Sequence, residues 1–281
     1  MTLQRPDTMT TPRHTPALGR PNPRARHALA FATALALVSG ALLAGCSAQQ
    51  KEDEARRKRD AEQALNHFER ASAMADSGDV RGSIREYALA VRLDPDFAPA
   101  WYALGNQLRR TGGLADAIEA WQRAIKADPK MVQAYNNLGV AYTAAGEPQK
   151  ATIVLRRATA LDPGYARAWS SLGAAYDAAG EHTRAVLTIK EAIEIDPQST
   201  TAWANLGNAY AHQDLWKEAV DAFQRSVRLD PNDPGTRFNL GVALIEVGQK
   251  QDALVELDAL QTLDPARADD LRERLRLGAV R

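Results

Sequence analysis

The sequence predicts an all-α chain, built as a solenoid of about six helix–turn–helix repeats with a C-terminal capping helix. Asp-Pro pairs recur every 34 residues, with the prolines at Pro95, Pro129, Pro163, Pro197, Pro231 and Pro265. Leu-Gly pairs keep the same period, from Leu104-Gly105 to Leu240-Gly241. Between these marks the apolar residues have helical spacing, as Tyr135, Leu138 and Tyr142 do. A constant period of this length indicates tandem units that bury their apolar faces against one another.

The composition of the 281-residue chain excludes several classes of protein. It holds 35 Lys and Arg against 35 Asp and Glu, so the basic surface of a nucleic-acid-binding domain is not expected. Cys46 is the only cysteine, which excludes a disulfide framework and a cysteine-rich zinc site. The five histidines lack the HExxH spacing, and phosphate-binding glycine loops are absent. We therefore expect no metal, no other cofactor and no nucleic-acid partner.

Residues 1–45 have the layout of an export signal. Arg20, Arg24 and Arg26 precede an uncharged stretch over residues 28–45 that is rich in Ala and Leu. A basic flank, a short apolar run and then small residues are typical of a secretory signal. An apolar run of this length also approaches that of a single membrane-spanning anchor, so both interpretations stand at this point.

The end of the apolar run, Leu43-Ala44-Gly45-Cys46, resembles the lipobox of bacterial lipoproteins. That resemblance implies cleavage before Cys46 and acylation of its thiol. Ser47 follows the cysteine where an inner-membrane retention signal has Asp, which by the same resemblance implies the outer membrane of a Gram-negative host. The basic flank is long for such a signal, and Met9 offers a second start besides Met1.

Residues 46–63 are polar and densely charged, and they are predicted to form a tether or the exposed start of a helix. Residues 64–267 then divide into six units. The first unit, 64–97, is degenerate, because His67 and Arg70-Ala71 stand where the aromatic residue and Leu-Gly are expected. The other five units are 98–131, 132–165, 166–199, 200–233 and 234–267. Residues 268–281 are predicted to form the capping helix, with Leu271 and Leu275 covering the end of the array.

The recurring small residues and prolines have mechanical roles. Gly112, Gly146, Gly180 and Gly248 fall between the paired helices, where a turn requires positive φ. Asp214 replaces this glycine in the fifth unit, and Arg237 replaces the aromatic residue in the sixth. Gly139 and Ala151 are small where the two helices of a unit are expected to cross. Each Asp-Pro pair is expected to end a second helix.

An aromatic residue precedes Leu-Gly by three positions in four units, at Trp101, Tyr135, Trp169 and Trp203, and an alanine follows in each. With the terminal proline and the period of 34, this pattern resembles the tetratricopeptide repeat (TPR) family over residues 64–267. The resemblance implies a right-handed solenoid in which the first helix of each unit lines a concave face.

On that implied face lie the candidate residues of a peptide-binding groove: Tyr102, Asn106, Arg109, Asn136, Asn137, Arg167, Asn205, Asn208, Phe238 and Asn239. Asparagine carboxamides offer both donors and acceptors, so a row of them can pair with the backbone of an extended peptide. The alternative is a plain solvated polar face. Asn106 and Asn137 also match two positions of the dicarboxylate clamp of some TPR domains, but Tyr102 and Ser171 stand where that clamp needs cations.

The signal, tether, repeats and cap account for the whole sequence and leave no room for a catalytic domain, so an enzyme is not expected. The predicted function is that of a lipid-anchored scaffold that binds a protein or peptide partner in the cell envelope. In architecture the chain resembles lipoproteins of pilus biogenesis and adaptors for peptidoglycan hydrolases. Two alternatives remain, namely an accessory subunit of an envelope enzyme or transport complex and a membrane-tethered cytoplasmic scaffold.

Overall fold

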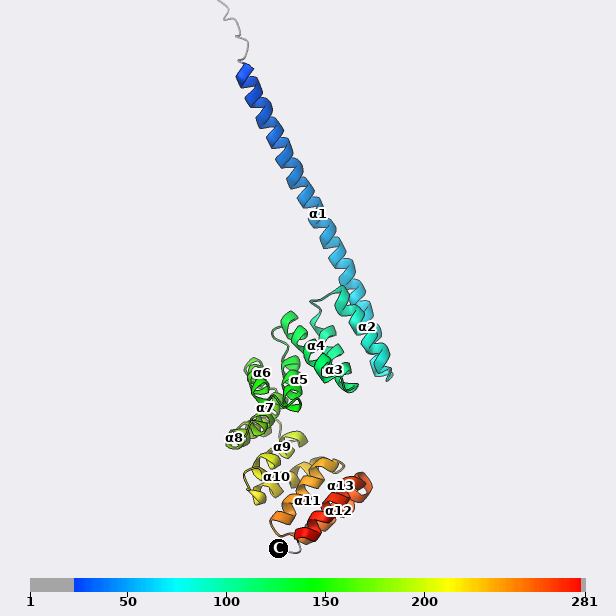
Figure 1. Cartoon of the computed structure of the whole chain (residues 1–281), viewed down its shortest axis with the longest axis vertical. Helices are drawn as coiled ribbons and strands as arrows, with labels where there is room; N and C mark the ends of the chain where they lie inside the picture. Colours follow the sequence, from blue (N-terminus) through cyan, green and yellow to red (C-terminus); the bar gives the residue numbers. More distant parts are fainter. Residues whose placement is uncertain (1–22, 279–281) are drawn as a thin grey trace, which may run out of the picture. The chain divides into compact units, whose positions relative to one another are not determined.

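The computed structural model describes the backbone of residues 23–278 and the side chains of residues 49–276. Throughout this range the regular elements are α-helices (Figure 1). The chain divides into two compact units, residues 1–59 and residues 60–281. The predicted export signal and the thiol of Cys46 lie outside the residues whose side chains are described, so they remain predictions. Among residues 49–276, whose side chains are described, no helix has the length and apolar character that crossing a membrane requires.

Helix α1 (Pro23–Asp76) includes the segment predicted as a tether. Residues 49–63 are helical with mostly exposed side chains, and Arg56 lies 3.8 Å from Asp53 one turn away. From residue 64 onward α1 has a buried face, because Ala64 and Ala71 are fully buried against α2 (Val80–Leu93). The degenerate first unit is therefore still a helical hairpin, with α1 supplying its first helix.

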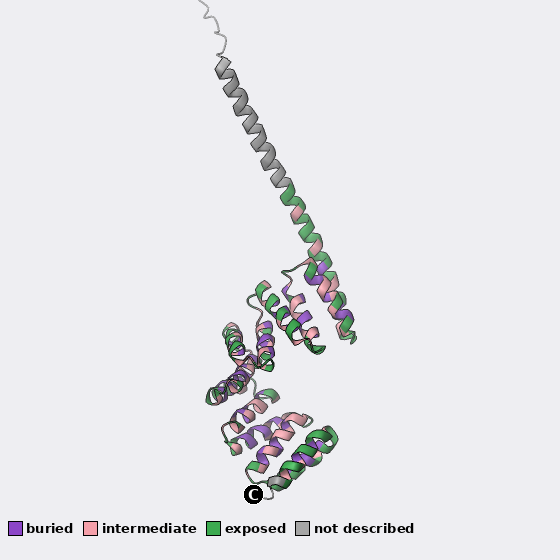
Figure 2. Ribbon diagram, viewed as in Figure 1, coloured by how far each residue is buried: buried purple, intermediate pink, exposed green. Residues whose placement is uncertain are grey.

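The remaining units each contribute two helices, which pack on the next helix along the chain. The first helices of these units are α3 (Ala98–Arg110), α5 (Val132–Ala144), α7 (Ala166–Ala178), α9 (Thr200–Ala211) and α11 (Pro234–Glu246). The second helices are α4 (Leu114–Ala127), α6 (Pro148–Leu161), α8 (His182–Ile195), α10 (Trp216–Leu229) and α12 (Lys250–Leu263). Buried and exposed faces alternate along every helix of the array (Figure 2). The all-α repeat solenoid predicted from the sequence is confirmed.

The turn inside each hairpin depends on a residue with left-handed backbone. Gly112 has φ +84°, and Gly78, Gly146, Gly180 and Gly248 have φ between +74° and +86°. In the fifth unit Asp214 takes the same conformation with φ +56°. Asp is among the few residues other than Gly that tolerate this region, which explains why the turn survives the substitution.

The Asp-Pro pairs end the second helices by two effects. Asp128 has an extended backbone, with φ −130° and ψ 96°, as the steric demand of the following Pro129 requires. Its Oδ1 also accepts a hydrogen bond from the Lys130 amide at 2.9 Å. The same contact to the amide two residues ahead recurs at Asp94, Asp162, Asp196 and Asp230. The aspartate thus forms a local turn that leads the chain into the next repeat.

Small residues allow the two helices of a hairpin to approach closely. A Cβ added at Gly139 in α5 would lie 2.3 Å from Cγ of Leu155 in α6. Leu155 is fully buried, as are the large side chains at equivalent contacts, namely Trp121, Ile189 and Phe223. Each of these four hairpins therefore places one bulky residue directly over its Leu-Gly glycine.

Arg237 replaces the aromatic residue of the sixth unit without losing its hydrogen bond. In three earlier units the indole Nε1 donates to the carbonyl of the proline six residues before it, as Trp101 does to Pro95 at 2.9 Å. Arg237 Nε donates to Pro231 in the same way at 2.6 Å. Its NH1 also pairs with Glu256 at 2.6 Å, and both side chains are largely buried.

The capping helix α13 (Pro265–Gly278) begins at Pro265, three residues before the predicted start at residue 268. Pro265 therefore both ends α12 and opens α13, because proline is tolerated in the first turn of a helix. Leu271 is fully buried over Gly241, and Leu275 packs on the neighbouring cluster. These are the two leucines expected to cover the end of the array.

Candidate functional site

The predicted asparagines form hydrogen bonds between neighbouring repeats. Asn137 Nδ2 on α5 donates to Asn106 Oδ1 on α3 at 2.8 Å and lies 3.4 Å from the Tyr102 hydroxyl. Asn106 Oδ1 also accepts from the Trp121 indole at 3.2 Å. The carboxamide at this position is therefore engaged by the array itself.

The same arrangement recurs further along the array. Asn239 Nδ2 donates to Asn208 Oδ1 at 3.0 Å, and Asn205 Nδ2 donates to the buried Ser170 hydroxyl at 3.0 Å. In each case an asparagine on the first helix of one repeat donates a hydrogen bond to a side chain on the first helix of the preceding repeat. The asparagine row thus ties successive repeats together, and much of its donor capacity is already used.

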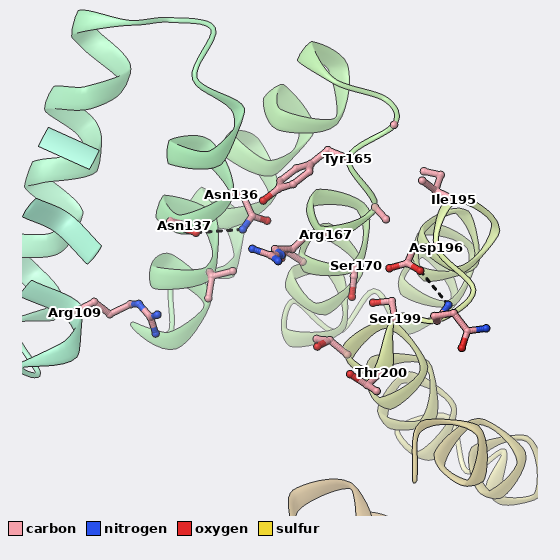
Figure 3. A pocket seen from close by; sticks show the side chains of 16 residues that line it. Arg109, Asn136, Asn137, Tyr165, Arg167, Ser170, Ile195, Asp196, Ser199 and Thr200 are labelled. Atoms are coloured by element: carbon pink, nitrogen blue, oxygen red, sulfur yellow. Dashed lines mark hydrogen bonds between the residues drawn. The ribbon is translucent and has the colours of Figure 1, made fainter. Parts of the chain in front are cut away.

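A hollow of about 770 Å³ opens beside this row (Figure 3). It is lined by the end of α3, by the first helices α5, α7 and α9, and by the end of α8 with the loops that precede α7 and α9. A volume of this size is typical of a ligand-binding pocket. Four predicted site residues line it, namely Arg109, Asn136, Asn137 and Arg167. The structure thus brings these four residues, which come from three different repeats, to one hollow.

Two of these residues are cations without partners. Arg109 and Arg167 are exposed, and within the described part of the chain neither guanidinium makes an ion pair or hydrogen bond. Both project into the hollow in Figure 3. A guanidinium presents several N–H donors in one plane and suits a carboxylate. Together they make this wall of the hollow electropositive.

Asn136 supplies a buried acceptor. Its side chain is only 2% exposed, and its Nδ2 lies 3.4 Å from Asn137 Oδ1. Its own Oδ1 has no hydrogen-bond partner. Buried polar atoms are nearly always paired in folded proteins, so this oxygen, on a residue that lines the hollow, would gain from an external N–H donor if the side chain turned toward the hollow.

The opposite wall is the start of α9. Ser199 caps this helix, and its Oγ accepts a hydrogen bond from the Ala202 amide at 3.3 Å. Thr200 and Thr201 in the first turn line the hollow, where a helix has unpaired amide donors and a partial positive charge. Asp196 adds one carboxylate, whose Oδ1 is engaged by the Gln198 amide at 3.0 Å.

The other predicted site residues lie elsewhere. Phe238 and Asn239 line a second hollow of about 650 Å³ near α13, together with Asp264, Arg267 and Asp270. The remaining four, Tyr102, Asn106, Asn205 and Asn208, do not line either hollow. Their contacts are with the asparagine row described above.

Sequence reasoning missed Tyr165, Ser170 and the run Ser199-Thr200-Thr201, which complete the hollow. The sequence contained only a weak indication of these residues. Ser-Thr-Thr just after an Asp-Pro turn marks a well-capped helix start, and no other unit has such a run at this place.

Tandem helical hairpins with a period of 34 residues, with a bulky side chain packed on every Leu-Gly glycine, define the chain as a TPR protein. The chain belongs to the family of the cilia and flagella-associated protein 70 C-terminal domain, whose model matches residues 56–280. No curated protein sequence matches it.

Solved structures share the fold. A chain of the APC/C hetero-tetramer Cut9–Hcn1 superposes with a TM-score of 0.68 at 21% identity, covering 76% of this chain. The match spans only 43% of that longer chain. MamA is 31% identical with a TM-score of 0.54, covering 60% of this chain and 93% of its own. PilW, a type IV pilus biogenesis factor, is 18% identical with a TM-score of 0.65, covering 72% of this chain and 94% of its own.

Proposed function

We propose that this chain is a non-enzymatic, lipid-anchored scaffold of the bacterial cell envelope that binds an extended peptide segment of a partner protein in the hollow formed by α5, α7 and α9. TPR folds serve protein–protein interaction, and PilW with the same fold is a pilus biogenesis factor. A pilus or secretion assembly is accordingly the first system in which to seek the partner. The lipobox-like Leu43-Ala44-Gly45-Cys46 supports attachment through Cys46 on the periplasmic side of the outer membrane.

One observation carries the binding proposal, namely that donors and an acceptor without partners converge on a single hollow. Arg109, Arg167 and the first turn of α9 offer donors to an anion, whereas Asn136 Oδ1 needs a donor. A peptide backbone supplies the N–H group, and an acidic side chain or a free C-terminus supplies the carboxylate. The proposed ligand is therefore a peptide that bears a carboxylate near a backbone amide.

The size of the effect can be estimated from these contacts. A hydrogen bond to a charged group contributes about 1.5–3 kcal/mol to binding. Because Arg109 and Arg167 are exposed and salt screens their charges, the contribution of each is expected at the lower end of this range. Replacement of both is expected to weaken peptide binding by about 3 kcal/mol, which is roughly 100-fold. The affinity should also fall as the salt concentration rises.

The partner can be sought by crosslinking in intact cells followed by pull-down of the full-length chain. The test variant is Arg109→Ala/Arg167→Ala. The matched control is Arg156→Ala/Arg157→Ala, which removes two exposed arginines of α6 that do not line the hollow. A peptide from the captured protein is then titrated, once with its carboxylate and once with that group as an amide.

We expect the control to bind as the wild type does, and both the test variant and the amidated peptide to bind at least tenfold more weakly. Equal binding by both variants would refute the role of the hollow. An enzyme recovered as the partner, with its rate altered by the chain, would favour the accessory-subunit alternative.

The anchor is tested separately. Metabolic labelling with an alkynyl palmitate should mark the wild-type chain and leave Cys46→Ser unlabelled, and membrane fractionation should then place the labelled chain in the outer membrane. Equal labelling of the two chains would contradict acylation at this thiol. If the chain carries no label and is found on the cytoplasmic side of the membrane, the result would favour the membrane-tethered cytoplasmic scaffold.

A further inference from the structure

Away from the hollow, two histidines converge on one carboxylate. His182 Nδ1, at the start of α8, lies 2.7 Å from Asp177 Oδ1 at the end of α7. His212 Nδ1, at the C-cap of α9, lies 2.9 Å from the other oxygen, Asp177 Oδ2. The two imidazole rings are 5.3 Å apart between centroids. Three helices from two successive repeats therefore meet at this carboxylate.

The cluster has the donor set and spacing of a transition-metal site. One ligand atom from each of the three residues lies within 4.8 Å of the other two. A tetrahedral zinc ion with bonds of about 2.0–2.1 Å holds its ligand atoms roughly 3.3 Å apart. The two histidine–carboxylate distances, 2.7 and 2.9 Å, are close to that value, and no pair of ligand atoms is more than 4.8 Å apart. Two imidazoles and one carboxylate favour zinc and its neighbours over Mg²⁺ or Ca²⁺.

The burial of the three side chains also fits a site that is fixed but accessible. The Asp177 side chain is 11% exposed, that of His182 is 31% exposed and that of His212 is 58% exposed. The carboxylate is thus held within the array, while the exposed histidine leaves a way in for an ion. Three protein ligands would leave the fourth position of a tetrahedral ion to water.

The cluster is specific to one junction between repeats. One period earlier, the equivalent positions hold Thr143, Pro148 and Ala178, and one period later they hold Ala211, Trp216 and Glu246. None of these sets can bind a transition metal. The three ligands are therefore not a by-product of the repeat pattern.

We propose that Asp177, His182 and His212 form a zinc site. Each neutral imidazole would coordinate through Nδ1 with its single proton on Nε2, and Asp177 would coordinate through one carboxylate oxygen. Zinc would replace the two hydrogen bonds by coordinate bonds and join the α7–α8 hairpin to α9.

Such a site would influence the geometry of the hollow, because it would join α7 and α9, two of the helices that line the hollow. Asn205 and Ser170 join α9 to α7 at one level, and His212 and Asp177 join them seven residues later in each helix. Seven helical residues span about 10 Å. A bound ion would fix the second of these contacts and hence the angle between two helices that line the hollow.

The test is a titration of the purified full-length chain in detergent with ZnCl₂, in competition with a chromophoric zinc chelator. We expect one zinc per chain, and X-ray absorption should show two imidazoles with N/O ligands at about 2.0–2.1 Å. His182→Asn, His212→Asn and Asp177→Asn should each lower the affinity at least tenfold. Hydrogen exchange in α7–α9 should slow on addition of zinc in the wild type and not in these three variants.

His67→Asn is the matched control, because His67 Nδ1 also contacts a carboxylate, that of Glu86 at 2.8 Å, in a different repeat. It should bind zinc as the wild type does. Circular dichroism of each variant checks that the fold is retained, and His212 is exposed enough for its loss to leave the core intact. Absence of binding to the wild type would overturn the proposal, as would undiminished binding to His182→Asn/His212→Asn.

Discussion

The contact between Gly139 and Leu155 offers a quantitative test of how the hairpins are packed. A Cβ at Gly139 would lie 2.3 Å from Cγ and 2.7 Å from both Cδ atoms of Leu155, which is fully buried. Protein interiors are close-packed, so the Gly139→Ala substitution must displace Leu155 or separate α5 from α6. The substitution Leu155→Ala removes the same three atoms.

The expected free energies follow from these contacts. Overpacking costs about 1–3 kcal/mol, whereas Ala in place of a mid-helix Gly contributes about 1 kcal/mol. Gly139→Ala should therefore destabilise the chain by about 1 kcal/mol. Leu155→Ala should cost about 3 kcal/mol, because it leaves a cavity in the core. In the Leu155→Ala background the new methyl meets none of those atoms, so Gly139→Ala should become stabilising by about 1 kcal/mol.

The assay is urea unfolding of the full-length chain and its variants, followed by circular dichroism and tryptophan fluorescence. Agreement of the two signals shows whether the array unfolds in one transition, which repeat proteins do not always do. Gly112→Ala is the control, since its φ of +84° makes any side chain strained but no atom lies within 4 Å. Its cost, about 1–2 kcal/mol, should be the same in both backgrounds. If Gly139→Ala destabilises both backgrounds equally, close approach to Leu155 is not why this position is glycine.

Three further predictions concern single contacts of the array. Arg237→Ala should lower the free energy of unfolding by about 3 kcal/mol, because it leaves the largely buried Glu256 without its partner; Arg237→Ala/Glu256→Ala should recover part of this loss in the same urea assay. Burial opposes ionisation of Asp233, but hydrogen bonds from the Thr236 hydroxyl and from the Gly235 and Thr236 amides outweigh it and hold the pKa of Asp233 below its ordinary 3.8. The stability contributed by ionised Asp233 is therefore present above pH 3.8 and lost as the pH falls through the lower folded-state pKa. Asp233→Ala should cost about 1 kcal/mol at pH 7 and less at pH 2 in thermal unfolding. The neutral isostere Asp233→Asn should lose stability at pH 7 and little at pH 2. Asn137→Ala should cost about 1 kcal/mol of stability, because the asparagine joins two repeats; a stability equal to that of the wild type in urea would show that this bond contributes nothing.

Local chemistry made much of the fold predictable from the sequence. Positive φ at Gly112 and its equivalents followed from the need for a turn, and the end of each second helix followed from Asp-Pro. Even the exception at Asp214 kept its conformation, because aspartate tolerates the left-handed region. These features depend on a residue and its immediate neighbours, which the sequence states directly.

Contacts between repeats were less predictable. The asparagines were expected to face a peptide, yet their Nδ2 atoms bond to the preceding repeat. Two spacings occur. Asn137 contacts Asn106, and Asn239 contacts Asn208, 31 positions apart. Asn137 also contacts Tyr102, and Asn205 contacts Ser170, 35 positions apart. Asp177 and His212 share this spacing. A search for polar pairs 31 and 35 apart, the period minus three and plus one, would have found these contacts, whereas a search at the period itself does not.

The position of the hollow follows from where the repeats differ. Folding requires a close contact at each Leu-Gly glycine, which four units make within the hairpin and the sixth makes with Leu271 of α13. Recognition requires the opposite, because a surface identical in every repeat cannot distinguish one ligand. Arg109 has Thr143 at the equivalent place one period later, and Arg167 has Gln133 before it and Thr201 after it. Departures from the repeat on the inner face are therefore better guides to binding than the asparagines that recur along it.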